Sequence, residues 1–186
     1  MPDPRIERTR THVLTTARQL LGELREPLTF TNLAAAAQVS RRTLYVHFGT
    51  VEKVISEALS IGDVDASFDP AGLTLRERLE EFLTHVRSLM STPVTRVAMA
   101  TLVNRAVHDE TAAAELRAVN DAHLAQFREL VGPISADDYA NLVGPIVYSQ
   151  WVTNKPASEA LLRDLVERGV SAVETSQPLS SGAAGA

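Results

Sequence analysis

The residues best suited to bind another molecule lie close together near the N-terminus, between positions 41 and 47. This short segment carries two arginines, a threonine, a tyrosine and a histidine: Arg41, Arg42, Thr43, Tyr45 and His47. Guanidinium groups bond in pairs to guanine edges, and hydroxyl groups bond to phosphate oxygens. A tyrosine among arginines and a histidine is a poor choice for a face that meets only water. The segment therefore predicts contact with the phosphates and base edges of DNA.

Two short helices joined by a tight turn would present these side chains outward. Thr29 and Ser40 are good N-caps, the first for a helix ending near Gln38 and the second for a helix over 41–48. Small or apolar side chains would form the inner face: Leu33, Ala36, Ala37, Val39, Leu44 and Phe48. This pattern predicts a helix-turn-helix over residues 29–48, whose second helix enters a major groove.

The same segment resembles the tetracycline-repressor (TetR) family of transcriptional regulators. The matching residues are Leu33-Ala34, Ala37, Val39-Ser40, Thr43-Leu44-Tyr45 and His47-Phe48. An amphipathic helix precedes them at the spacing typical of the family. The resemblance covers roughly residues 9–60 and is specific there, because the Thr-Leu-Tyr-x-His-Phe string occurs in its expected context.

The resemblance implies roles for individual side chains. Thr43, Tyr45 and His47 match positions that contact phosphates, whereas Arg41 and Arg42 occupy the variable positions that read bases. Four further residues are expected to contact DNA from or near helix N-termini: Thr29, Thr31, Thr50 and Lys53. The implied partner is double-stranded DNA with a pseudo-palindromic operator, bound by a homodimer.

Two positions depart from the family pattern. Members usually have glycine where this chain has Gln38, a position that often requires a left-handed backbone. Such a backbone costs a non-glycine residue about 1 kcal/mol. Many members also carry lysine where this chain has Val51, so one phosphate contact is expected to be missing. Three arginines precede the first predicted helix or open it, Arg5, Arg8 and Arg10; they form either an arm that enters the minor groove or a solvated tail.

Composition favours an all-α fold. Of 186 residues, 45% are hydrophobic but only 5% are aromatic, whereas stacked β-sheets usually contain more aromatic and β-branched residues. The absence of cysteine excludes disulfides and thiolate metal sites. No apolar run is long enough for a membrane span and the N-terminus has no apolar signal core, so a cytoplasmic protein is expected. The net charge is −5, divided as +2 over residues 1–60 and −7 over residues 61–186, which indicates an anion-binding head on an acidic body.

Apolar periodicity predicts about nine helices and no strand. Their approximate bounds are 9–24, 33–38, 41–48, 51–59, 74–90, 94–107, 111–131, 135–152 and 158–173. Residues 94–107 are apolar nearly all round, which is typical of a central buried helix. We expect a DNA-binding domain over 1–60, a ligand-binding and dimerisation domain over 61–175, and a disordered tail over 176–186.

The larger body has no sharp motif, and the family analogy supplies its expected roles. The last two predicted helices carry apolar stripes suited to a four-helix dimer interface: Leu142, Val143, Ile146, Val147, Gln150, Trp151, Leu162, Leu165, Val166 and Val170. A pocket for a small lipophilic ligand would be lined by Phe82, Met90, Met99, Leu102, Val103, Asn104 and Phe127. The alternative is that these seven residues are ordinary core.

No pattern supports catalysis, a metal or a cofactor. The five histidines lack ligand spacing, and no nucleophile elbow, phosphate-cradling glycine loop or HExxH string is present. The leading hypothesis is a repressor that a ligand releases from its operator. A regulator without a small-molecule inducer is the second hypothesis, and a helical enzyme that shares only the head region is the third.

Overall fold

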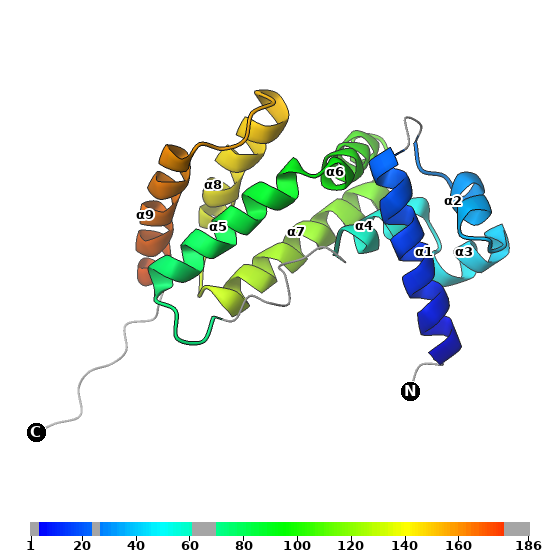
Figure 1. Ribbon diagram of the computed structural model, residues 1–186, viewed down its shortest axis with the longest axis horizontal. Coiled ribbons are helices and arrows are strands. Elements are labelled where there is room, and N and C mark those ends of the chain that lie inside the picture. Colours follow the sequence, from blue (N-terminus) through cyan, green and yellow to red (C-terminus); the bar gives the residue numbers. More distant parts are fainter. Residues whose placement is uncertain (1–3, 24–26, 61–69, 177–186) are drawn as a thin grey trace, which may run out of the picture. The chain divides into compact units, whose positions relative to one another are not determined.

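The computed structural model describes residues 4–23, 27–60 and 70–176, and these residues form nine α-helices and one π-helical turn, without a strand. This confirms the predicted all-α class (Figure 1). The helices are α1 Pro4–Glu23, α2 Phe30–Ala36, α3 Arg41–Phe48, α4 Val51–Ser60, α5 Leu75–Ser91, α6 Pro93–Ala106, α7 Glu110–Leu130, α8 Ala136–Val147 and α9 Glu159–Ser176, with the π-turn η1 at Tyr148–Val152.

The chain forms two compact units that differ from the predicted domains. Unit 1 comprises Met1–Asp63 and Thr92–Ala122, and unit 2 comprises Val64–Ser91 and His123–Ala186. The predicted head therefore also contains α6 and most of α7. The physical reason is burial, because Ala98, Leu102 and Val119 from these two helices complete the core of the head. Most of the tail predicted over 176–186 lies outside the described residues, and Ser176 is the last residue of α9.

The core of unit 1 is built around the apolar stripe of α1. Its members Val13, Ala17 and Leu21 are almost completely buried. They share one cluster with Leu44 of α3 and Ile55 of α4. Burying a side chain of this size stabilises the fold by about 1.5–3 kcal/mol, so this shared cluster holds the helices of unit 1 together.

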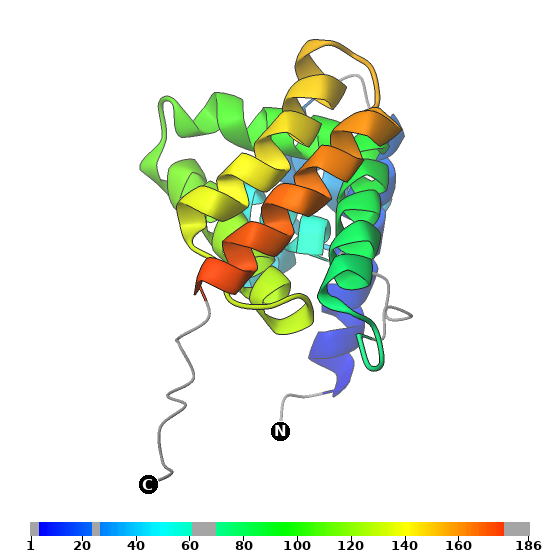
Figure 2. The same ribbon diagram turned by 90° about the vertical axis from the view of Figure 1, so that its left-hand side faces the viewer.

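Unit 2 packs α5, α8, α9 and the last turns of α7 around an aromatic group. The rings of Phe82 and Phe127 meet edge to face with centroids 5.0 Å apart, and Tyr139 lies 5.6 Å from Phe127. Figure 2 shows α8 and α9 running side by side next to α5. Gly169 permits the close approach of α9 to α5, because a Cβ atom there would lie 2.8 Å from the side chain of Leu79.

One expected feature of the helices is wrong. The sixth helix was expected to be buried all round, but only Thr95, Ala98 and Leu102 of α6 are buried. Val103 is 45% exposed, and Val107, the residue that ends the helix, is 71% exposed. The helix predicted over 135–152 ends at Val152 as expected, but its last residues, Tyr148–Val152, form the π-helical η1 soon after Pro145, whose ring removes a backbone N–H donor.

Candidate nucleic-acid interface

The helices of the helix-turn-helix begin at side-chain caps that the sequence predicted. Thr29 Oγ1 accepts from the backbone N–H of Asn32 at 3.2 Å, and Asn32 Oδ1 accepts from that of Thr29 at 2.8 Å. Ser40 Oγ accepts from the backbone N–H of Thr43 at 3.0 Å. These bonds satisfy N–H groups that lack partners within their own helices, so both helix starts are fixed locally.

The turn between α2 and α3 uses a left-handed residue, as the resemblance implied. Gln38 has a φ of 53°, in the region that favours glycine. The N–H of Val39 then donates to the carbonyl of Ala34 at 3.1 Å, which closes the end of α2. The turn therefore has the backbone geometry expected of the family although its residue is glutamine.

The outer face of α3 carries the side chains predicted to reach DNA. Arg41, Arg42 and Tyr45 are exposed, and Thr43 and His47 are half-buried. The opposite face, Leu44 and Phe48, is buried in unit 1. Tyr45 is 60% exposed, but its ring is held edge-on against Phe30 of α2 with centroids 4.6 Å apart. These side chains therefore project outward from a helix anchored on its inner side.

The four further residues expected to contact DNA fall into two groups. Thr29 and Thr31 are exposed at the start of α2, and Thr50 precedes α4, where its Oγ1 accepts from the N–H of Lys53 at 3.1 Å. A hydroxyl that accepts can still donate, so these threonines keep a proton for a phosphate. Lys53 differs, because its Nζ lies 3.5 Å from Glu115 and 3.9 Å from Glu57. Its charge is compensated within unit 1, and we leave it out of the interface.

The N-terminal arginines are not an extended arm. The helix α1 begins at Pro4, so Arg5, Arg8 and Arg10 all lie within it. Proline is favoured at the first helical position because its φ is already helical and its missing N–H has no helical role there. Arg8 Nε donates to the carbonyl of Pro4 at 3.2 Å, and Arg10 forms an ion pair with Glu57 of α4. Both alternatives given for this segment, an unfolded arm and a solvated tail, are corrected over residues 4–10.

The buried residues expected to line a ligand pocket are divided between the cores of the two units. Phe82, Met90 and Phe127 belong to the core of unit 2, whereas Met99 and Leu102 belong to that of unit 1. The side chains of Val103 and Asn104 are exposed. The alternative interpretation, ordinary core, fits the five buried or half-buried residues, and the other two lie on the outer side of α6.

Most residues expected at the dimer interface lie inside their own protomer. Six are buried in unit 2: Leu142, Ile146, Gln150, Leu162, Leu165 and Val166. The remaining four are half-buried and pack against the same core: Val143, Val147, Trp151 and Val170. Gln150 Oε1 accepts from Ser91 Oγ at 3.1 Å within this unit. Periodicity identified the apolar stripe of each helix correctly. It could not distinguish a stripe that packs in the core of its own protomer from one that packs against a second copy.

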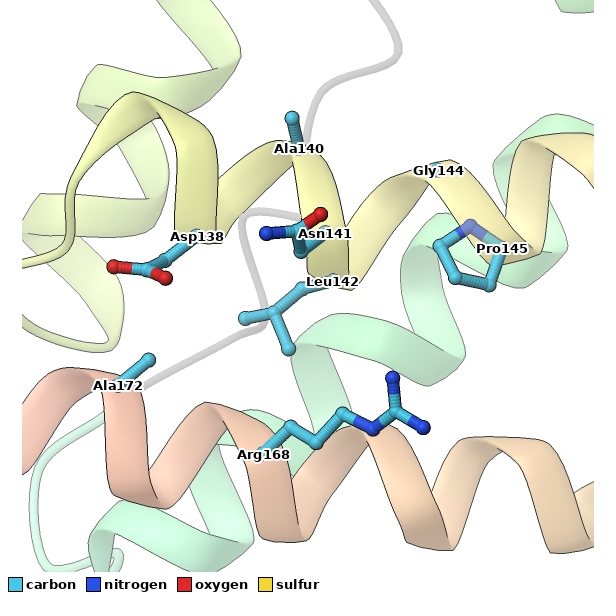
Figure 3. A pocket seen from close by; sticks show the side chains of 8 residues that line it. All are labelled: Asp138, Ala140, Asn141, Leu142, Gly144, Pro145, Arg168 and Ala172. Carbon is cyan, nitrogen blue, oxygen red and sulfur yellow. The ribbon is translucent and has the colours of Figure 1, made fainter.

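Apart from Leu142, the outward face of α8 and α9 is formed by other residues than those expected at the dimer interface. An open groove of about 590 Å³ lies over this face, lined by Asp138, Ala140, Asn141, Leu142, Gly144, Pro145, Arg168 and Ala172 (Figure 3). The exposed aromatic Tyr148 follows on the same side of α8 one turn beyond Gly144. The signal that could have found this face is the run of small residues that alternates with the buried stripe.

Among the described residues, the ionisable groups with displaced pKa values all belong to unit 2. A hydrogen bond from Arg76 lowers the pKa of Glu167, and a hydrogen bond from Arg87 lowers the pKa of Glu159. The pKa of Glu77 is lowered by hydrogen bonds from Thr74. These pairs join α5 to α9 or cap α5, so they are structural contacts of that unit.

Within the described part of the chain, no group of three or more histidine and acidic side chains could hold a metal ion. None of the described helices is both long and apolar enough to cross a membrane.

Comparison with known proteins places the fold in a recognisable class. The chain is similar to a solved structure from Rhodococcus sp. assigned to the TetR family of transcriptional regulators, with a TM-score of 0.60 and 18% sequence identity over 89% of this chain and 99% of that one. A second structure with the same family assignment, from Vibrio parahaemolyticus, has a TM-score of 0.46 at 19% identity, over 89% of this chain and 98% of that one. No family model matches the chain, and no curated protein does. The chain thus has the all-helical fold of the Rhodococcus protein.

Proposed function

We propose that this protein is a sequence-specific DNA-binding transcriptional regulator that acts as a homodimer. The observation that carries the proposal is the outer face of α3, where Arg41, Arg42 and Tyr45 project from a helix whose other side is buried. An exposed recognition helix with arginines in its first turn is suited to a major groove. The shared fold and the resemblance over residues 9–60 support the same conclusion, and the cytoplasm is the compartment in which we expect the protein to act.

A homodimer is proposed because one helix-turn-helix rarely makes enough contacts for specific binding. The partner would pack on the outward face of α8 and α9. Gly144 is open there, since a Cβ atom on it would meet nothing within 4 Å beyond its own chain neighbours and helix backbone, and Ala140 and Ala172 are also small. Such a face allows two helices to approach closely, and two helices from each copy would form a four-helix interface.

The direct test is selection from random duplex DNA followed by affinity measurement. We expect enrichment of a pseudo-palindrome with a guanine in each half-site, because arginine at 41 or 42 bonds to guanine O6 and N7. Arg42→Ala should weaken binding by about 1–3 kcal/mol and relax the preference at one position of each half-site. Arg163→Ala, an exposed arginine on α9 of unit 2, is the matched control. If no sequence is enriched and the protein does not bind duplex DNA even at low ionic strength, the proposal is wrong.

A small lipophilic ligand that releases the operator stays a prediction. Neither unit gathers the seven expected pocket residues around one cavity, so the regulator without a small-molecule inducer remains an equal alternative. A thermal-shift screen of lipophilic compounds, repeated with operator DNA bound, separates the two. A compound that raises the unfolding temperature of the free protein and lowers its DNA affinity favours the ligand-responsive repressor.

A further inference from the structure

We propose that Arg10 of α1 is a positioning residue, which fixes the end of α3 and so aims the recognition helix without touching DNA. This inference rests on the proposed function for its consequence, although the contacts themselves lie within unit 1. Arg10 Nη1 donates to the carbonyl of His47 at 3.3 Å, and its Nη2 pairs with Glu57 of α4. The guanidinium carbon also lies 4.9 Å from the centre of the Phe48 ring.

These contacts supply a hydrogen-bond donor and a positive charge at the C-terminal end of α3. The last carbonyls of a helix have no partner within that helix, and together they carry partial negative charge. In α3 the carbonyl of Tyr45 accepts from the N–H of Gly49 at 3.0 Å, and the carbonyl of His47 accepts from Arg10. A cation at this end is favourable, and stacking over Phe48 holds it in place. With two turns only, α3 depends on such contacts for its direction.

Side chains of α1 also contact the C-terminal carbonyls of α2 and α4. His12 Nε2 lies 3.1 Å from the carbonyl of Ala37, the C-cap of α2, and must be the donor there because a carbonyl only accepts. Arg18 Nη1 donates to the carbonyl of Ala58 in the last turn of α4 at 2.6 Å. Three nitrogen-bearing side chains of one helix thus meet the C-terminal carbonyls of α2, α3 and α4. The repetition indicates that α1 serves as the frame that orients all three.

Arg10 is poorly placed to contact phosphate as well. Its side chain is 31% exposed, and its guanidinium already engages a carboxylate, a carbonyl and an aromatic ring. The charge of Glu57 also compensates it locally. A positioning residue and a phosphate contact differ in their dependence on salt, because only a phosphate contact releases counterions, at a slope of about 0.9 per contact.

The first experiment compares Arg10→Gln with the wild-type protein in plots of log affinity against log salt. We expect operator affinity to fall about tenfold with the slope unchanged. Arg8→Gln is the matched control, since Arg8 lies on the same helix and, among the described residues, donates to the carbonyl of Pro4 within it. A slope shallower by about one unit would identify a phosphate contact and overturn the inference. Unchanged affinity would overturn it too.

A second variant, Glu57→Gln, separates positioning from charge. Removing this carboxylate makes the protein more positive, so a purely electrostatic role of Arg10 predicts tighter DNA binding. Positioning predicts weaker operator binding, since an amide oxygen holds the Arg10 guanidinium less strongly than a carboxylate does. Tighter binding by Glu57→Gln would therefore contradict the proposal. Arg10→Lys, which keeps the charge but not the fork of donors, should bind between wild type and Arg10→Gln and guards against a variant that fails to fold.

A measurement in the absence of DNA tests the role of Arg10 independently of the proposed DNA-binding function. Amide hydrogen exchange at residues 45–49 should accelerate in Arg10→Gln but not in Arg8→Gln, because the end of α3 loses its external bond. If the wild-type protein binds no duplex, the proposed function fails while this readout still decides whether Arg10 holds α3. Equal exchange in the two variants would show that it does not.

Discussion

The ring of Tyr45 on α3 stands at 86° to the ring of Phe30 on α2, with their centroids 4.6 Å apart. Phe30 is 6% exposed and Tyr45 is 60% exposed, so one ring belongs to the core and the other leans on it from outside. An edge-to-face pair of this kind adds about 0.5–1.5 kcal/mol beyond the area it buries. The first helix of the motif thereby orients a side chain that the second helix presents to solvent.

Replacing Tyr45 separates its orientation from its hydroxyl group. Tyr45→Phe keeps the packing on Phe30, so the free energy of unfolding should change by less than about 0.5 kcal/mol. Operator affinity should still fall by about 1.5–3 kcal/mol if the hydroxyl bonds to a charged phosphate. Tyr45→Ala should lose both affinity and stability. Urea unfolding and fluorescence anisotropy measure the two effects, with exposed Val107→Ser as control; full affinity in Tyr45→Phe would exclude a hydroxyl contact.

The left-handed backbone at Gln38 predicts how stability responds to its replacement. Gln38→Gly should raise the free energy of unfolding by up to about 1 kcal/mol, because glycine adopts a φ of 53° without the Cβ clash. Gln38→Val should lower it, because a β-branched residue tolerates this region worst. Ala35→Gly, at an exposed position inside α2, is a control that should destabilise. If Gln38→Gly lowered the free energy of unfolding in urea, as the other two variants are expected to do, this turn would adopt another backbone.

The ion pair between Glu52 of α4 and Arg105 of α6 should respond asymmetrically to mutation. The side chain of Glu52 is 9% exposed and that of Arg105 is 32% exposed. Arg105→Ala leaves the enclosed carboxylate without its partner and should lower the free energy of unfolding by about 1–3 kcal/mol. Glu52→Gln should cost less, since an amide oxygen still accepts from Arg105. A double-mutant cycle on thermal or urea unfolding measures the coupling; additive effects would mean that the pair is not formed.

The open face of α8 provides a clean test of the proposed dimer. Gly144→Arg adds a long charged side chain where nothing beyond its own chain neighbours and helix backbone lies within 4 Å, so the protomer itself should still fold. The dimer should dissociate, because the added side chain occupies the space of the partner helix. Sedimentation velocity measures the mass, and operator affinity should fall in parallel. Exposed Glu174→Gln on α9, which changes the net charge by the same amount, is a charge-matched control; a Gly144→Arg dimer of wild-type stability would place the interface elsewhere.

The amino-acid sequence by itself determined the helical class, the bounds of α3 and the side chains that α3 presents, whereas α2 begins and ends earlier than the predicted 33–38. These are local properties. The caps at Thr29 and Ser40, the left-handed turn at Gln38 and the 3.6-residue periodicity each depend on neighbours a few positions away. For the same reason, the resemblance over residues 9–60 predicted the inner and outer faces of the recognition helix.

Only the tertiary structure decided which surfaces the other helices meet. The stripe of α8 containing Leu142 and Ile146 turned out to face its own core, and Leu102 of α6 joined the head and not the body. From the sequence, Arg10 was expected to contact DNA or solvent, but it bonds to the carbonyl of His47 and forms an ion pair with Glu57. Periodicity identifies an apolar face, and a charged residue indicates that a polar partner is needed. Which residues about 40 positions away supply those contacts depends on the tertiary packing of the helices, which local patterns do not encode.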